Sequence, residues 1–181
     1  PGTTVCVQPN QQFCVIATDL DDPLKNIDFA VEAFAVLKAN NPALRLALVG
    51  NSGARFEGRD GVDVLGQVDG TSIREILVRS QALLLPSLAE NAPSVVAEAA
   101  CVGTPTIALN IPPLAEIIGS LASGCLVESP EEMAKEMSKF CGEVPNPIHS
   151  VDRRKLKSTA RLLFESRRIA ERYIQIYEEE R

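Results

Sequence analysis

The chain has 181 residues, of which 45% are apolar and 23% are charged. This composition fits one globular domain with its own core, and no apolar run reaches the roughly 18 residues that a membrane-spanning helix needs. The net charge of −6 argues against a nucleic acid as partner. With one histidine, His149, and five cysteines in no metal-binding spacing, we expect neither a zinc site nor a histidine-based triad.

The start of the sequence and its cysteines suggest where the protein acts. The first residues, PGTTVCV, lack the basic segment and apolar segment of a secretory signal. The missing initial Met suggests a piece cut from a longer chain. Unpaired cysteines are typical of a reducing compartment, so the predicted location is cytoplasmic.

Apolar runs of strand length alternate with amphipathic segments of helix length. Strands are predicted at 13–18, 44–50, 62–66, 82–86, 104–109 and 124–128. Helices are predicted at 26–41, 71–80, 92–103, 112–121 and 129–141. The strands are apolar almost throughout, so both faces of the sheet should be covered. The predicted fold class is α/β, a Rossmann-like doubly wound parallel sheet of about six strands.

Sequence signals also predict how the helices begin and end. Thr71 or Ser72 should cap the helix at 71–80, and Ser129 the helix at 129–141. In the helix at 92–103, Pro93 should be the first residue and Gly103 should end it.

The predicted domain organisation is a Rossmann-like domain over residues 1–150 and a C-terminal helical extension of it over 151–181. A proline-rich loop at 141–150 separates the two. An apolar stripe on the extension should pack on the domain, or mediate self-association where it is exposed. The stripe consists of Leu162, Leu163, Ser166, Ile169, Ala170, Tyr173, Ile176 and Tyr177.

Two loops at the carboxyl ends of predicted strands carry the candidate site, because such sheets bind ligands there. They are TDLDDPLKN at 18–26 and PSLAENAPS at 86–94. A helix that begins near Pro93 directs free backbone N–H groups into the crevice and forms an anion site. Glu90 precedes this helix and Glu98 lies roughly 7.5 Å along it. A diphosphate flanked by two hydroxyl-rich groups, as in a nucleotide sugar, fits this pattern. A solvated helix residue and a surface loop acid would show the same spacing.

Residues 82–109, ALLLPSLAENAPSVVAEAACVGTPTIAL, resemble the signature of family 4 (group 1) glycosyltransferases, which are retaining GT-B-type enzymes. That signature has a Glu, seven residues, a second Glu, and then Gly-Thr-Pro. Glu90, Glu98 and residues 103–105 match it. The resemblance covers about residues 13–128. It implies the donor-binding C-terminal domain of such an enzyme, with the N-terminal acceptor domain absent from this chain and no metal or other cofactor required.

The resemblance also implies roles for individual residues. Glu90 and Lys25 would be catalytic: Glu90 contacts hydroxyls of the transferred sugar, and Lys25 stabilises the negative charge of the leaving diphosphate. Glu98 would bind the ribose hydroxyls. The other residues assigned to the donor are Asn91, Ala92, Pro93 and Ser94 beside the diphosphate and sugar, and Gly50 and Val68 beside the nucleobase.

The loop after the first strand departs from the family pattern. The family usually has an Arg there, paired with the Lys. This chain has Asp19, Asp21 and Asp22 instead, and acids beside a diphosphate repel it. Either a basic residue comes from elsewhere or these acids point away. Asn26 stands where Gly is commoner.

Two other readings of the sequence remain open. VIATDLDDPL resembles the start of a haloacid-dehalogenase-type phosphatase, in which Asp19 would attack phosphorus and Asp21 would act as acid and base with magnesium. Pro23 stands where that motif has Thr. The third reading is a non-catalytic Rossmann-like nucleotide-binding or interaction module.

Overall fold

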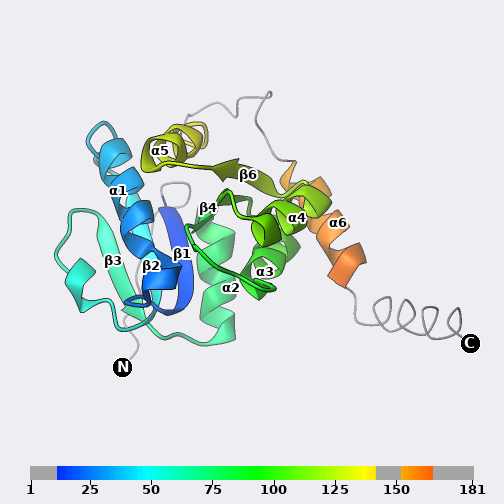
Figure 1. Cartoon of the computed structure of the whole chain (residues 1–181), viewed down its shortest axis with the longest axis horizontal. Helices are drawn as coiled ribbons and strands as arrows, with labels where there is room; N and C mark the ends of the chain where they lie inside the picture. Colours follow the sequence, from blue (N-terminus) through cyan, green and yellow to red (C-terminus); the bar gives the residue numbers. More distant parts are fainter. Residues whose placement is uncertain (1–11, 142–151, 165–181) are drawn as a thin grey trace, which may run out of the picture.

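A computed structural model describes residues 12–141 and 152–164 of the chain. Its six strands form one parallel sheet in the order β3-β2-β1-β4-β5-β6 (Figure 1). They are β1 (Gln12–Asp19), β2 (Arg45–Asn51), β3 (Val62–Gly66), β4 (Ser80–Leu85), β5 (Thr106–Leu109) and β6 (Gly124–Val127). The sheet confirms the predicted α/β, Rossmann-like fold class, and every predicted strand is present within two residues of its predicted ends.

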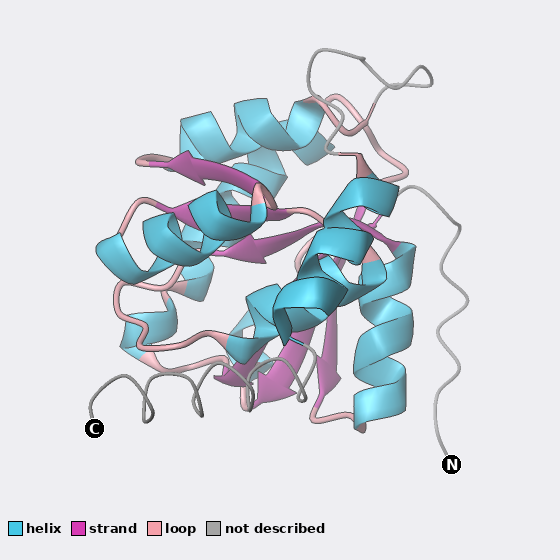
Figure 2. Cartoon of the chain, turned by 90° about the vertical axis from the view of Figure 1, so that its right-hand side faces the viewer, coloured by secondary structure: helices cyan, strands magenta, loops and turns pink. Residues whose placement is uncertain are grey.

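Helices cover both faces of the sheet, so that the strands lie between helical layers (Figure 2). The α-helices are α1 (Ile27–Lys38), α2 (Gly70–Arg79), α3 (Ser94–Val102), α4 (Pro112–Leu121), α5 (Pro130–Ser138) and α6 (Arg153–Phe164). Two short 3-10 helices, η1 (Pro23–Lys25) and η2 (Ala54–Phe56), were not predicted.

The core alternates along each strand, as the two-residue period of a strand requires. Phe13 and Val15 of β1 belong to the cluster that α1 and α5 cover. Cys14, between them, faces the opposite cluster with Leu77 of α2. Burial on both faces explains why the strand sequences are apolar almost throughout.

Two predicted helix starts need correction. The cap of α2 is Asp69, not Thr71 or Ser72, because its carboxylate accepts a hydrogen bond from the Ser72 N–H at 2.7 Å. Pro93 is the N-cap of α3 rather than its first residue. The predicted Ser129 cap of α5 is confirmed.

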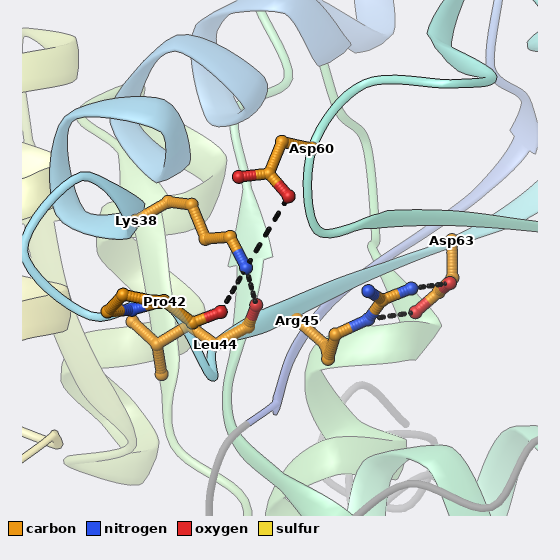
Figure 3. Close-up of polar contacts among 6 residues, drawn as sticks. All are labelled: Lys38, Pro42, Leu44, Arg45, Asp60 and Asp63. Carbon is orange, nitrogen blue, oxygen red and sulfur yellow. Dashed lines mark hydrogen bonds and ion pairs between the residues drawn. The ribbon is translucent and has the colours of Figure 1, made fainter.

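Lys38, at the end of α1, is only 8% exposed and anchors the amino ends of β2 and β3 (Figure 3). Its ammonium donates to the carbonyls of Pro42 and Leu44 and lies 3.8 Å from Asp60. A buried ammonium needs such partners because burial removes its hydration. This cluster lies at the amino ends of the strands, the edge opposite the candidate site.

The C-terminal extension is described only as far as α6. Leu156 and Ala160 of α6 are buried in a cluster with residues of α3 and α4. Leu162 and Leu163, the described part of the predicted stripe, are 50% and 45% exposed. The rest of the stripe and His149 lie outside the described residues. The division of the chain into 1–150 and 151–181 stays a prediction.

Among the helices that the structure describes, none combines the length and the apolar character that crossing a bilayer demands.

Candidate functional site

The candidate site is a cleft of about 390 Å³ at the carboxyl ends of the strands. From β1 the chain adds β2 and β3 on one side, and β4 then pairs on the other side (Figure 1). The loops after β1 and β4 therefore diverge, and doubly wound folds bind their ligands at such a switch point. The polar residues that line the cleft are Thr18, Lys25, Gln67, Glu90, Ser94 and Glu98. The other lining residues are Ile16, Ala17, Val49, Gly50, Val68, Ile73, Leu85, Ala92, Pro93 and Val95.

The cleft brings together eight of the nine predicted site residues, while their roles stay predictions. These eight are Lys25, Gly50, Val68, Glu90, Ala92, Pro93, Ser94 and Glu98. Asn91 is exposed and does not line the cleft. Glu98 is exposed towards the cleft, so it is not the solvated outer-face residue that its spacing alone permitted.

Lys25 and Glu90, which both line the cleft, form an ion pair. Lys25 Nζ donates to Glu90 Oε1 at 2.7 Å. The side chains are 23% and 13% exposed, so the pair is screened less than a surface pair. It joins the loop after β1 to the loop after β4.

Backbone contacts hold the Lys25 loop against the loop after β4. Asp22 caps the short helix η1, and its side chain accepts a hydrogen bond from the Leu24 N–H at 2.9 Å. The Leu88 N–H donates to the Leu24 carbonyl at 2.8 Å. Asn26 Nδ2 donates to the Pro86 carbonyl at 3.2 Å. Lys25 thus sits in a segment fixed on both of its sides.

Asn26 explains why Gly is commoner at its position. Its φ of 51° lies in the left-handed region, which Gly enters freely and which Asn tolerates better than most residues. The departure from the family pattern therefore preserves the backbone turn and adds a side-chain bond.

The start of α3 leaves backbone donors free of any side-chain cap. Pro93 is the N-cap and makes no side-chain cap hydrogen bond. Pro93 has no N–H, but it lies before the first turn of α3, so every residue of that turn, beginning with Ser94, keeps its backbone donor. Ser94 and Val95 line the cleft, which places this partly positive helix end at its wall.

The three acids after β1 are engaged in bonds outside the cleft, and none of them lines it. Asp19 accepts from the Asp21 N–H at 3.0 Å, and Asp22 caps η1. Asp21 accepts from the Gly53 N–H at 3.2 Å and from Arg55 Nε at 2.9 Å. The Gly53 bond, followed by the Arg55 bond, lowers the pKa of Asp21. The second alternative left by the sequence therefore fits the structure, since none of the three acids lines the cleft. The first does not, because Arg55 pairs with Asp21 outside the cleft and the described lining holds no second cation beside Lys25.

The phosphatase reading gains no support from these positions. Asp19 and Asp21 lie outside the cleft lining. Within residues 12–141 and 152–164, no three His, Cys, Asp or Glu side chains are grouped closely enough to hold a metal ion. That chemistry requires two such aspartates to share magnesium with further acids.

Eight of the lining residues were not among the predicted site residues, and they include Thr18, Gln67 and Ile73. Gln67 follows Gly66, which ends β3 with a φ of 68°. A polar residue directly after a strand's carboxyl end was an available signal, because that edge binds ligands. Gln67, Val68 and Ile73 lie in and after the loop that follows β3, whereas Lys25 and Glu90 come from the loops after β1 and β4.

The profile of the family described as "Glycosyl transferases group 1" matches residues 9–147. The chain belongs to the group 1 glycosyltransferases. This match confirms the resemblance carried by Glu90, Glu98 and the Gly-Thr-Pro at 103–105. No curated protein matches the sequence.

Solved glycosyltransferase structures share the fold of this group 1 domain. A pneumococcal O-GlcNAc transferase, GtfA, solved with UDP and GlcNAc, is 18% identical, with a TM-score of 0.71 over 93% of this chain and 35% of that chain. Sucrose-phosphate synthase from Thermosynechococcus elongatus is 22% identical, with a TM-score of 0.74 over 95% of this chain and 46% of that chain. WaaG, a glycosyltransferase involved in lipopolysaccharide biosynthesis, is 22% identical, with a TM-score of 0.72 over 85% of this chain and 44% of that chain. The chain thus spans between about a third and a half of these proteins.

Proposed function

We propose that this domain binds the nucleotide-diphosphate-sugar donor of a retaining, GT-B-type glycosyltransferase. The observation that carries the proposal is the cleft at the switch point, where Lys25, Glu90, Glu98 and the uncapped start of α3 meet. An acceptor-binding domain outside this chain would complete the enzyme. The family match supports this function, as do the glycosyltransferases among the proteins of similar fold.

The chemistry of the cleft suits each part of such a donor. The start of α3 offers backbone N–H groups to the diphosphate. Glu98, one turn further along the helix, can accept hydrogen bonds from ribose hydroxyls, and Glu90 from hydroxyls of the sugar. Val49, Val68 and Ile73 provide an apolar wall for the base, with the Gln67 amide beside them.

Lys25 supplies the counter-charge for the proposed reaction. When the bond between the sugar and the diphosphate breaks, negative charge develops on a phosphate oxygen. A fixed cation stabilises this charge, and losing it raises the barrier by roughly 2–4 kcal/mol. We assign this task to Lys25 rather than to a metal ion. Glu90, the ion-pair partner of Lys25 in the structure, is then free to accept hydrogen bonds from the sugar.

The proposed setting is cytoplasmic, and the thiols fit it. Cys14, Cys101, Cys125 and Cys141 are free in the part of the chain that the structure describes. Burial raises the pKa of Cys14 to about 12, so this thiol stays protonated at neutral pH. A cytosol keeps such thiols reduced.

The test is isothermal titration calorimetry of the chain with UDP, GDP and ADP and their sugar conjugates. We expect the chain to prefer one nucleobase. Glu98→Gln should weaken the binding of the bare nucleotide and of the nucleotide sugar alike by about tenfold, which corresponds to roughly 1.4 kcal/mol. Glu90→Gln should weaken the binding of the nucleotide sugar only. Glu116→Gln is the matched control, because Glu116 is an exposed acid on α4 outside the cleft lining.

Two results would contradict the proposal. One is the absence of binding by any nucleoside diphosphate. The other is a Glu98→Gln variant that binds as tightly as the Glu116→Gln control. A non-catalytic nucleotide-binding module is the alternative, and it predicts that Glu90→Gln has no effect specific to the sugar. We also expect the chain alone to bind donor without transferring sugar, since the proposed acceptor site belongs to another domain.

A further inference from the structure

Arg55 lies outside the cleft, on η2, and holds the loop that carries Lys25. Its Nε donates to Asp21 Oδ1 at 2.9 Å, and its Nη1 donates to Asp28 Oδ2 at 2.5 Å. Asp21 precedes η1 and Asp28 lies in the first turn of α1. Arg55 therefore bridges the two sides of the segment that presents Lys25.

Both oxygens of the Asp21 carboxylate are occupied by the loop after β2. Oδ1 accepts from Arg55, and Oδ2 accepts from the Gly53 N–H at 3.2 Å. These two bonds orient the Asp21 carboxylate towards the loop after β2, and Asp21 is not among the residues that line the cleft.

Packing holds the loop after β1 against the loop after β2. Leu20 is fully buried, and its N–H donates to the Asn51 carbonyl at 2.9 Å. A Cβ on Gly53 would lie 2.6 Å from Leu20 Cδ1, and Gly53 has a φ of 87°. The loop after β2 thus lies directly against Leu20, one residue before Asp21.

The charge balance of the cleft makes the direction of Asp21 important. The described lining residues contribute one cation, Lys25, and two carboxylates, Glu90 and Glu98, which gives +1 − 2 = −1. Asp21 is four residues from Lys25. A free carboxylate there would add a third negative side chain to Glu90 and Glu98 near a bound diphosphate and repel it.

We infer that Arg55 is a positioning residue for donor binding: it holds the Asp21 carboxylate away from the diphosphate and keeps the Lys25 loop in place. The inference rests on the proposed function of the cleft. It also explains how the proposed diphosphate could bind beside an acidic loop where an Arg is usual, because Arg55 of η2 pairs with two acids of this region, Asp21 and Asp28.

The test is a charge-rescue experiment by calorimetry, with the preferred nucleoside diphosphate as the probe. We expect Arg55→Ala to weaken binding by about tenfold. The double variant Arg55→Ala/Asp21→Asn should recover most of that loss, because the released side chain is then neutral. Asp21→Asn alone should bind within about twofold of the wild type.

Arg59→Ala is the matched control. The guanidinium of Arg59 lies 5.3 Å from the centroid of the Phe56 ring, and that of Arg55 lies 4.2 Å from the same ring. Arg59→Ala therefore removes a cation from the same loop without releasing Asp21, and should leave the affinity unchanged. Thermal unfolding and hydrogen exchange of the amides of residues 20–25 report whether loosening of the loop accompanies each change.

The outcomes separate the inference from the proposed function. Wild-type affinity in Arg55→Ala overturns the inference alone. A double variant as weak as Arg55→Ala, with equally raised hydrogen exchange, overturns the charge role, because loosening alone would then explain the loss. A wild-type chain that binds no nucleoside diphosphate overturns the proposed function, and the inference with it.

Discussion

Asn26 shows how a single backbone angle positions the lysine of the cleft. Its left-handed φ of 51° lets the chain turn from η1 into α1. Its side chain bonds to the Pro86 carbonyl at 3.2 Å, and the preceding residue, Lys25, meets Glu90. The turn and the ion pair therefore depend on the same two loops.

Substitutions at Asn26 can separate the backbone contribution from the side-chain bond. Asn26→Gly removes the bond to Pro86 and keeps access to the left-handed region. Asn26→Ala removes the same bond and also forces a Cβ into that region. We expect Asn26→Ala to be less stable than Asn26→Gly by about 1 kcal/mol. Urea unfolding measures the difference. Equal stability of the two variants would show that the φ at this position relaxes without strain.

At the residue scale, sequence reasoning could predict positions that local sequence determines, but not contacts between residues that are distant in the sequence. Glu90 and Glu98 could be placed in a cleft because the family signature around them and the strand ends are local features of the sequence, whereas their spacing alone would also have fitted surface residues. The partners of Asp21 could not, because Arg55 lies 34 residues away in the sequence and meets it only through the pairing of β1 with β2. Gln67 was missed although its place after a strand was readable.

At the scale of elements, the strands were predictable because burial on both faces makes them apolar. The first residues of the helices were harder to predict. Asp, Ser and Thr all cap helices well, and Asp69, Thr71 and Ser72 lie within four positions, so the sequence offers three caps for α2. Geometry selects Asp69, whose carboxylate reaches the Ser72 N–H at 2.7 Å.

The Asp69 cap gives α2 a pH-dependent stability. The Ser72 N–H, with a further bond to the Ser72 side chain, lowers the pKa of Asp69 below its ordinary value of 3.8. A lowered folded-state pKa means that the stabilisation is present above the unfolded-state pKa and is lost as the pH falls towards the folded-state pKa. The contribution should therefore be full at neutral pH and decline below about pH 4.

Two variants of Asp69 test this dependence. Asp69→Asn keeps a capping oxygen at every pH, whereas Asp69→Ala has none. In urea unfolding from about pH 7 to about pH 3, the wild type should be more stable than Asp69→Asn at neutral pH and approach Asp69→Asn in acid, because a protonated carboxyl keeps an acceptor oxygen but loses its charge. A constant gap between the wild type and Asp69→Asn across this range would rule out an ionised cap.

At the scale of the whole molecule, charge opposes the proposed ligand. The chain carries −6, and the lining residues sum to −1, yet the proposed ligand is a dianion or more. Attraction is therefore confined to short-range contacts with Lys25 and the start of α3. Repulsion acts over longer distances, where salt screens it within a Debye length of about 10 Å at 0.1 M.

This balance predicts an inverted salt response. Raising the ionic strength from about 0.02 M to about 0.3 M should increase the association rate constant of a fluorescent nucleoside diphosphate several-fold, since it removes long-range repulsion and affects the short contacts less. Stopped-flow measurements give this rate. Glu98→Gln should flatten the dependence more than Glu116→Gln, because both remove one negative charge but only Glu98 lines the cleft. A rate that falls steeply with salt would instead require an attractive cluster of cations at the cleft, beyond the single Lys25 that its described lining provides.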